Sequence, residues 1–414
     1  MIQQTAQRIP TGYKNSNIGV LPDDWDAKPL GDLGECLIGL TYKPEDVKEY
    51  GTLVLRSSNI FDGRLAFDDN VYVDLKVPER VKVRRGDILI CVRNGSRDLI
   101  GKCALVDARV EGEAFGAFMS VFRSSHSSFI FYQFQSNLVQ RQIRENIGAT
   151  INQITNKHLN SFSIPFPIEV KERTSIASVL SDVDTLIASL EKLIAKKRAI
   201  KQGAMQELLT GKRRLLGFSG NWKKKKLGDI LLLSATYSKT KFIDEGGNYL
   251  IMDMGSVSSG GQMIASKRTF LSADLLKIGD LVMPKDDIGG GNIIGKAAYI
   301  NQDNKYVLGD HVYKLSAKTP ETDTLFFSYL INGYAVNREL RKKVAGSAQL
   351  GLGRKSVEEQ DVKIPEEKTE QTAIAKVLSD MDAEIIQLEQ KLAKYRMLKQ
   401  GMMQVLLMGK VRLV

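Results

Sequence analysis

The sequence has few of the residues that build metal centres, disulfide frameworks or nucleophilic sites. Its 414 residues include three cysteines, three histidines and two tryptophans. Cys36, Cys91 and Cys103 show no CxxC spacing, and the histidines stand at neither HxH nor HxxxH spacing, so no metal site is predicted. We expect the cysteines to pack as small apolar residues rather than to form disulfides.

Long apolar runs and nucleotide-binding motifs are also missing. No stretch approaches the about 18 consecutive apolar residues of a membrane span, and residues 1–16 lack the apolar core of a signal peptide. The sequence contains no GxxxxGK(S/T) phosphate loop, no (D/N)PP(Y/F) tetrapeptide and no glycine-rich dinucleotide fingerprint. These absences predict a cytoplasmic chain without membrane contact, without ATPase or methyltransferase chemistry and without a cofactor of its own.

What the chain does have is length and positive charge. At about 100 to 200 residues per domain its length predicts two to four domains. A net charge of +11 indicates an anionic partner, with nucleic acid ahead of membrane. The surplus is concentrated in residues 191–216, with eight basic and two acidic side chains, and in residues 389–414, with six and one. Both segments form the C-terminal halves of predicted helices, where positive charge also suits the helix dipole and could contact a partner subunit. The charge therefore supports nucleic-acid binding less directly than the total implies.

The most informative feature is an internal duplication. Residues 174–215 align with residues 372–413 at an offset of 198, with 25 identities in 42 positions. A fainter match continues upstream, where Trp25 and the LGD that follows it correspond to Trp222 and a second LGD. The chain is therefore a tandem repeat. The predicted boundaries are an N-terminal lead (1–21), two globular domains (22–166 and 217–364) and a helical region after each of them (167–216 and 365–414).

The two parts of each repeat differ in their patterning. The globular parts mix short apolar runs with Gly, Asn, Asp and Ser breaks, which is typical of an α+β domain of short strands. Candidate strands are 52–56, 87–92, 103–107 and 118–123 in the first copy and 281–283, 296–300 and 311–315 in the second. The helical regions carry a heptad seam, with Ile176, Leu180, Val183, Ile187, Leu190 and Ile194 in one and Ile374, Leu378, Met381, Ile385, Leu388 and Leu392 in the other. Two such helices are expected to pack on each other.

Two irregularities interrupt the helical pattern. Lysines and a tyrosine occupy the next seam positions while apolar residues resume one step off at Ile200 and Leu398, which predicts a slip of the seam. Gly203 and Gly401 lie inside the pattern, where glycine costs about 1 kcal/mol relative to alanine. Close approach of another backbone would explain these glycines. The alternative is a helix that ends at each glycine, followed by a second short helix.

Two polar loops in each globular part are candidates for reading base edges. Arg or Lys pairs with guanine, Asn or Gln with adenine, and Asp or Glu with cytosine. Each loop keeps its frame between the copies while its contents differ, and such variation is typical of binding specificity. The candidate DNA-binding residues are Arg93, Asn94, Arg97, Asn152, Gln153, Asn156 and Lys157 in the first copy and Lys285, Asp286, Asn292, Gln349, Arg354 and Lys355 in the second. For any one of them, a solvated loop without a ligand is the alternative.

The order of W…LGD, GDIL…GK and LSDxDxxIxxLExxxAKxRxxKQGxMQxLLxGKxRL, present twice, resembles the specificity subunit of type I restriction and modification systems. The resemblance covers nearly the whole chain. It implies that each globular part is a target recognition domain for one half of a bipartite double-stranded DNA site. It also implies that the two helices form an antiparallel coiled coil that sets the unread spacer between the half-sites.

The same resemblance implies a scaffold without catalysis. Two methyltransferase subunits and two restriction subunits would join it, and S-adenosylmethionine, ATP and Mg²⁺ would belong to those partners. Only framework positions match the family in the globular parts, so no base-contacting residue carries over. A coiled-coil interaction or regulatory protein that binds RNA or protein through its globular domains is the alternative interpretation.

Overall fold

The computed structural model describes residues 9–148, 151–288, 290–346 and 350–413. The chain forms two compact units, one made of Met1–Leu190 and Lys391–Val414 and the other of Glu191–Gln390. The boundaries fall inside the two long helices, α4 (Val170–Leu208) and α9 (Lys368–Leu406). Each unit therefore contains one globular domain, the first half of the helix that follows it and the second half of the other helix.

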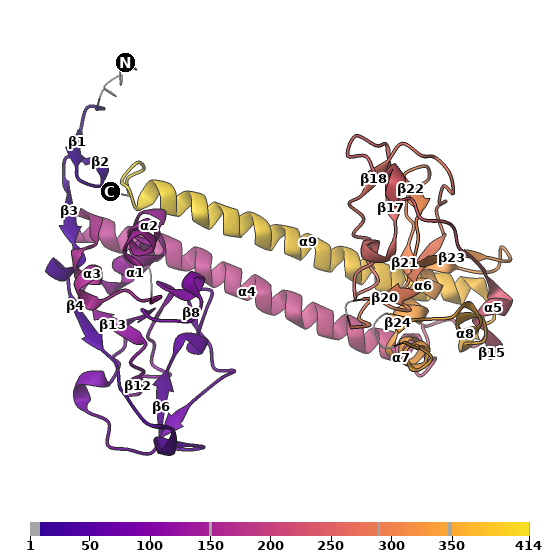
Figure 1. Ribbon diagram of the computed structural model, residues 1–414, viewed down its shortest axis with the longest axis horizontal. Coiled ribbons are helices and arrows are strands. Elements are labelled where there is room, and N and C mark those ends of the chain that lie inside the picture. The colour runs from indigo at the N-terminus through magenta and orange to yellow at the C-terminus, as the bar shows by residue number, and fades with distance from the viewer. Residues whose placement is uncertain (1–8, 149–150, 289, 347–349, 414) are drawn as a thin grey trace. The chain divides into compact units, whose positions relative to one another are not determined.

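The globular domain of the first unit is built on a four-stranded antiparallel sheet of order β11-β10-β13-β4. Figure 1 labels β13 and β4 of this sheet. A second sheet has the order β12-β6-β9-β5, and in it β12 runs parallel to β6. The strands are β1 (Tyr13–Ser16), β2 (Gly19–Pro22), β3 (Trp25–Pro29), β4 (Glu35–Ile38), β5 (Val47–Lys48), β6 (Thr52–Leu55), β7 (Ile60–Phe61), β8 (Arg64–Leu65), β9 (Tyr72–Val73), β10 (Ile88–Cys91), β11 (Cys103–Leu105), β12 (Ala114–Phe115), β13 (Met119–Arg123) and β14 (Ser163–Pro167). The short helices are α1 (Ser127–Gln135), α2 (Asn137–Asn146) and α3 (Asn156–Ser161).

The second unit repeats this architecture. Its four-stranded antiparallel sheet has the order β16-β23-β19-β21, and its smaller sheet, β18-β17-β22, again contains one parallel pair. The strands are β15 (Trp222–Lys226), β16 (Leu231–Ser234), β17 (Tyr249–Met252), β18 (Arg268–Thr269), β19 (Leu281–Pro284), β20 (Asp286–Asp287), β21 (Ala298–Tyr299), β22 (Tyr306–Leu308), β23 (Val312–Ala317), β24 (Leu350–Gly351) and β25 (Asp361–Pro365). The short helices are α5 (Leu227–Ile230), α6 (Thr324–Asn332), α7 (Tyr334–Lys342) and α8 (Arg354–Glu358). The candidate strands from the sequence are all confirmed.

Strand β10 shows why a short run of apolar residues forms the centre of each domain. Successive side chains of a strand point to opposite faces. Ile88 and Ile90 enter a core formed with α1 and the long helices. Leu89 and Cys91 enter a second core, which also contains residues of the second sheet, β12-β6-β9-β5. Because both faces are covered, all four residues of the strand are buried. The expectation for the cysteines holds at Cys91 and Cys103, which are buried and free.

The two long helices pair in antiparallel fashion within each unit, as the resemblance implied. In the second unit Lys197 of α4 pairs with Glu384 of α9, and Lys201, one turn further along α4, pairs with Asp382. In the first unit Lys399 of α9 pairs with Asp184 of α4 at 2.7 Å. The apolar residues of the seam are buried or half-buried along both helices.

Two expectations about these helices are wrong. The seam does not slip, because Ile200 and Leu398 are each 47% exposed, while lysines at the seam positions continue the contact as ion pairs. The helices also run through Gly203 and Gly401 without a break. A Cβ at either glycine would meet no described atom within 4 Å, so close approach of a backbone within this chain does not explain them.

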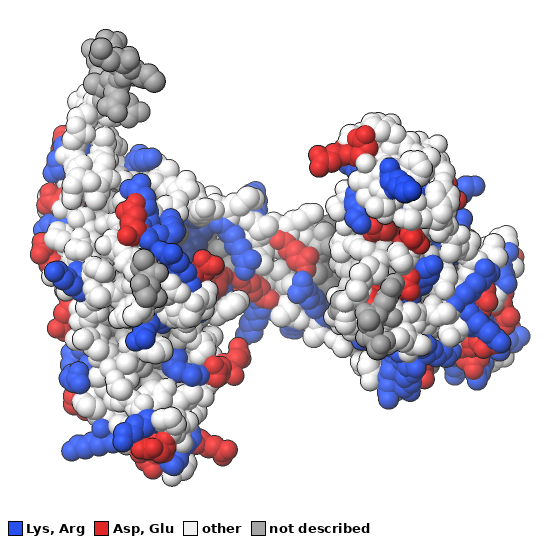
Figure 2. All heavy atoms as spheres, viewed as in Figure 1, with Lys and Arg blue, Asp and Glu red and all other residues white. Residues whose placement is uncertain are grey.

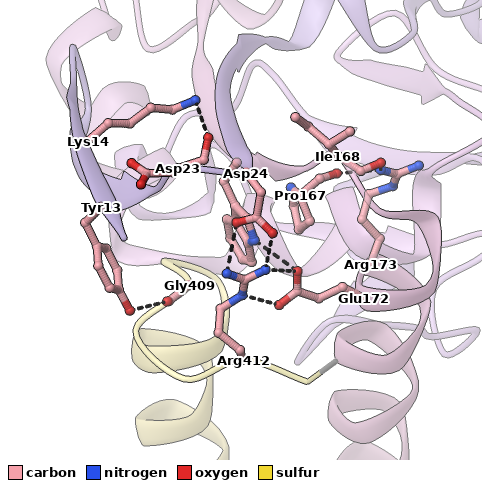
Figure 3. A network of polar contacts seen from close by, with 11 residues as sticks. Tyr13, Lys14, Asp23, Asp24, Pro167, Ile168, Glu172, Arg173, Gly409 and Arg412 are labelled. Atoms are coloured by element: carbon pink, nitrogen blue, oxygen red, sulfur yellow. Dashed lines mark hydrogen bonds and ion pairs between the residues drawn. The ribbon is translucent and has the colours of Figure 1, made fainter. Parts of the chain in front are cut away.

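A buried carboxylate anchors each long helix to the segment that follows the other one. Glu172 at the start of α4 accepts hydrogen bonds from Trp25 Nε1 at 3.0 Å and from Arg412 Nε at 2.6 Å (Figure 3). The Arg412 guanidinium also binds Asp24, with Nη1–Oδ1 at 2.9 Å. In the second unit the equivalent residues, Glu370, Trp222 and Arg214, form the same contacts. The segment that follows each long helix is therefore bonded to the first turn of the other long helix.

Candidate nucleic-acid interface

The two candidate loops of the first unit lie against each other. The first loop leaves β10 at Val92 and the second leads from α2 to α3. Arg93 and Gln153 form an isolated antiparallel bridge, and the backbone N–H of Asn94 donates to the Asn152 carbonyl at 3.3 Å. The Asn152 side chain in turn donates from Nδ2 to the Gly95 carbonyl at 3.0 Å. Segments separated by about 60 residues of sequence thus form one surface, as a shared reading site requires.

The second unit brings its two loops together in the same way. Strand β20, which holds Asp286, pairs with β24, with Asp286 opposite Gly351. The N–H of Leu352 donates to the Lys285 carbonyl at 2.7 Å and continues this pairing. Gln349 lies outside the described residues. The repeated fold therefore places corresponding loops side by side in both units although their sequences differ.

Some of the candidate side chains are exposed at the surface. Arg93, Arg97 and Lys157 in the first unit and Asn292, Arg354 and Lys355 in the second are exposed, while Gln153 and Lys285 are half-buried. Arg354 forms an ion pair with Glu358 at 2.7 Å, and Lys355 lies 3.8 Å from Glu359. Exposed helical pairs of this kind contribute only about 0.3–0.5 kcal/mol, so a phosphate or base edge can displace them.

Other candidate side chains form hydrogen bonds with residues of the protein itself. Asn156 donates from Nδ2 to the Cys36 carbonyl at 3.1 Å and accepts from Ser120 Oγ, also at 3.1 Å, so its amide joins α3 to the main sheet. Asn94 donates to Ser57 Oγ and accepts from the Ser96 N–H, both at 3.0 Å. Asp286 is bonded to His311 Nδ1 at 2.7 Å. These contacts give the three side chains a role in shaping the loops, which the sequence did not indicate.

Sequence reasoning missed Phe118. Phe118 is 56% exposed in the turn just before β13, and its ring lies beneath the Arg93 guanidinium, 4.8 Å from ring centroid to Cζ. An exposed aromatic ring under a cation holds the guanidinium plane in place and offers a surface for stacking. In the sequence Phe118 falls within the candidate strand 118–123, and nothing there marks its ring as exposed; the structure begins the strand at Met119.

The described residues lack the features of two other classes of site. No group of three or more His, Cys, Asp or Glu side chains among them is placed to hold a metal ion. In the same part of the chain, no helix combines the length and apolar character that crossing a bilayer requires.

Comparison with known proteins agrees with this duplicated arrangement. The specificity subunit of the type I restriction enzyme EcoKI from Escherichia coli (strain K12) is 26% identical over 387 residues, which cover 87% of this chain and 82% of that protein. The putative type I restriction enzyme MjaX specificity subunit of Methanocaldococcus jannaschii is 24% identical over 430 residues, covering 97% and 96%. Among solved structures, the S subunit of a type I restriction-modification system from M. genitalium has the same fold, with a TM-score of 0.62, 16% identity and coverage of 95% and 97%.

The family described as the type I restriction modification DNA specificity domain matches this chain twice, at residues 22–201 and 219–394. The two matches correspond to the two copies of the duplication, each with its globular domain and most of its long helix. The chain therefore belongs to the family of type I restriction modification DNA specificity domains.

Proposed function

We propose that this chain is the sequence-reading subunit of a type I restriction-modification complex and that each globular domain reads one half of a bipartite DNA site. The observation that carries the proposal is the pair of loops repeated on one scaffold with different side chains. In the first unit the loops present Arg93, Arg97 and Gln153, and in the second they present Lys285, Asn292 and Arg354. Different donors and acceptors at corresponding positions read different bases.

The chain acts without catalysis of its own. Two methyltransferase subunits and two restriction subunits bind to it, and they supply S-adenosylmethionine, ATP and Mg²⁺. The similarity of the two helical regions, which share 25 of 42 aligned residues, supports this assignment, because two copies of the same partner need two equivalent docking surfaces. The alternative, an RNA- or protein-binding regulator, has no observation in its favour, and the relatives described above are all specificity subunits.

Modularity is tested by a domain exchange. Residues 25–165 are replaced by the corresponding segment of a relative, and the methylated-adenine motif is read by sequencing the methylome of cells that carry the complete system. One half of the bipartite motif should change while the other half and the spacer stay the same. A change in both halves, or in neither, contradicts the assignment of one domain to each half-site.

The helices are proposed to set the spacer. Removing one heptad from both α4 and α9 shortens each helix by about 10 Å at 1.5 Å per residue. At about 3.4 Å per base pair this corresponds to about three base pairs. The methylome of the variant should show a shorter spacer between unchanged half-sites, or binding should be lost. An unchanged spacer would overturn the ruler mechanism without affecting the assignment of the domains.

A further inference from the structure

Each unit contains a groove between a short surface helix and the second half of a long helix. In the first unit α2 and the end of α9 enclose about 470 Å³, and the lining includes Arg141, Arg144 and Gln404. In the second unit α7 and the end of α4 enclose about 850 Å³, and the lining includes Arg338, Arg341 and Gln206. These are equivalent residues of the duplication, at offsets of 197 and 198, so the groove is one feature present twice.

The grooves contain positive charge and no acid. Among the described residues, the lining of the first holds Arg141, Arg144 and Lys410, and the lining of the second holds Lys296, Arg338, Arg341 and Lys342, with no Asp or Glu in either. Serine, asparagine and glutamine supply neutral hydrogen-bond donors beside them. Figure 2 shows Lys and Arg side chains gathered over α2 and over α7.

The cations of the second groove repel one another. Burial and the nearby Arg341 both lower the pKa of Lys296, whose ammonium donates to the Asn332 carbonyl at 3.4 Å. Two carboxylates on the same helices pair with cations of the linings. Glu145 lies 4.0 Å from Arg141, and Glu339 binds Lys342 at 2.7 Å. Neither carboxylate enters the groove lining, so an anion bound there would relieve the repulsion.

The arginines have been kept while their surroundings changed. Helices α2 and α7 differ at most positions, and among the exposed ones only Arg141 with Arg338 and Arg144 with Arg341 are identical in the two copies. The neighbouring loops, which are proposed to read bases, differ between the copies. A residue kept in both units therefore serves a contact that is the same at both half-sites. The sugar-phosphate backbone is the part of DNA that meets this condition.

The position of the arginines agrees with a backbone contact. In the second unit a guanidinium nitrogen of Arg341 lies 3.7 Å from the point that a Cβ added to Gly291, in the first candidate loop, would occupy. In the first unit α2 ends at Asn146 and leads directly into the second loop, where the Gly148 N–H donates to the Gln153 carbonyl at 3.4 Å. A duplex whose base edges meet these loops must place its phosphates beside them, within reach of long arginine side chains.

We propose that the two grooves bind phosphates of the DNA backbone and hold each half-site in register, with Arg141 and Arg144 as positioning residues in one unit and Arg338 and Arg341 in the other. This assignment rests on the proposed function. It deepens that function by separating residues that position the duplex from residues that distinguish bases.

The test is the salt dependence of DNA binding by the full chain. A fluorescent mixed-sequence duplex is titrated over a range of salt concentrations, and the logarithm of the binding constant is plotted against the logarithm of the salt concentration. The slope is negative, and each phosphate contact contributes about 0.9 to its magnitude. R141Q/R144Q should therefore lower the magnitude of the slope by about 2, as should R338Q/R341Q. The quadruple variant should lower it by about 4, at the same rate of about 0.9 per contact. R141K/R144K, which keeps the charge, should retain the slope of the unsubstituted protein.

A control variant removes equal charge elsewhere. R80Q/R85Q replaces two exposed arginines outside the groove and should leave the slope nearly unchanged. An equal loss in this control would show a net-charge effect and overturn the assignment. A groove variant with an unchanged slope but impaired binding to the methyltransferase subunit would also overturn it, because the groove would then dock an acidic protein segment. If the unsubstituted chain shows no salt-dependent binding to duplex DNA, the proposed function fails together with this inference.

Discussion

The buried Glu–Arg contacts allow a matched test of how a second carboxylate supports an ion pair. Glu172 and Glu370 are each 2% exposed, and the side chains of their partners, Arg412 and Arg214, are each 27% exposed. Screening by solvent is therefore equal in the two units. The difference lies in the remaining guanidinium contacts, because Arg412 also binds the Asp24 carboxylate, whereas Arg214 donates to the Gly220 carbonyl at 2.9 Å.

The substitutions E172Q and E370Q should consequently differ in cost. Removing one partner of a buried ion pair costs about 3–5 kcal/mol when the other charge is left uncompensated. We expect a loss near the lower limit, about 3 kcal/mol, for E370Q, because the partial exposure of Arg214 admits water. In E172Q the guanidinium keeps a carboxylate, and a charged hydrogen bond contributes about 1.5–3 kcal/mol, so the loss should be about half as large. Adding D24N to E172Q should raise the cost to that of E370Q.

The measurement exploits the two tryptophans, one of which lies in each network. In a W25F background the fluorescence of Trp222 reports urea unfolding of the second unit, and in a W222F background Trp25 reports the first. Separate probes are needed because a chain with two units does not unfold in a single two-state step. Equal losses for E172Q and E370Q, or a larger loss for E172Q, would refute the role assigned to Asp24.

Three further predictions concern the helices and the second unit. Alanine at Gly203 or Gly401 meets open space, so each substitution should raise the free energy of unfolding by up to about 1 kcal/mol, and a lower urea midpoint would contradict this. Tyr329→Phe removes a hydrogen bond of 2.8 Å to an α9 carboxylate and should cost about 1 kcal/mol, detected by Trp222 but not by Trp25. Hydrogen bonding to the buried Lys239 ammonium lowers the pKa of Asp274 below its ordinary 3.8. Its stabilising effect should be complete above pH 3.8 and lost as the pH falls through the lower folded value, and D274N should abolish this acid-dependent part of the Trp222 unfolding curve.

Local patterns in the sequence predicted much of this fold because they repeat at short intervals. The heptad spacing identified both long helices, and short apolar runs between Gly, Asn, Asp and Ser breaks identified three of the four strands in each main sheet, but not β4 or β16. The contact between Arg412 and Asp24 spans 388 residues and leaves no periodic trace. The internal roles of Asn94 and Asn156 were likewise invisible, because an asparagine that binds a carbonyl within the protein and one that binds adenine look alike in a sequence. Comparing the copies at exposed helical positions would have identified the groove arginines.

The duplication itself explains why the helices pair in antiparallel fashion. Asp184 and Asp382 are equivalent positions of the two copies, as are Lys201 and Lys399. A parallel pairing in register would place each residue beside its own equivalent, aspartate against aspartate and lysine against lysine, and like charges in contact are unfavourable. Antiparallel pairing instead places Asp184 beside Lys399 and Asp382 beside Lys201, at 2.7 and 2.5 Å. In each helix the acidic half precedes the basic half. Residues of opposite charge therefore meet along the seam only when the two helices run in opposite directions. Antiparallel pairing also explains why each unit contains the first half of one long helix and the second half of the other.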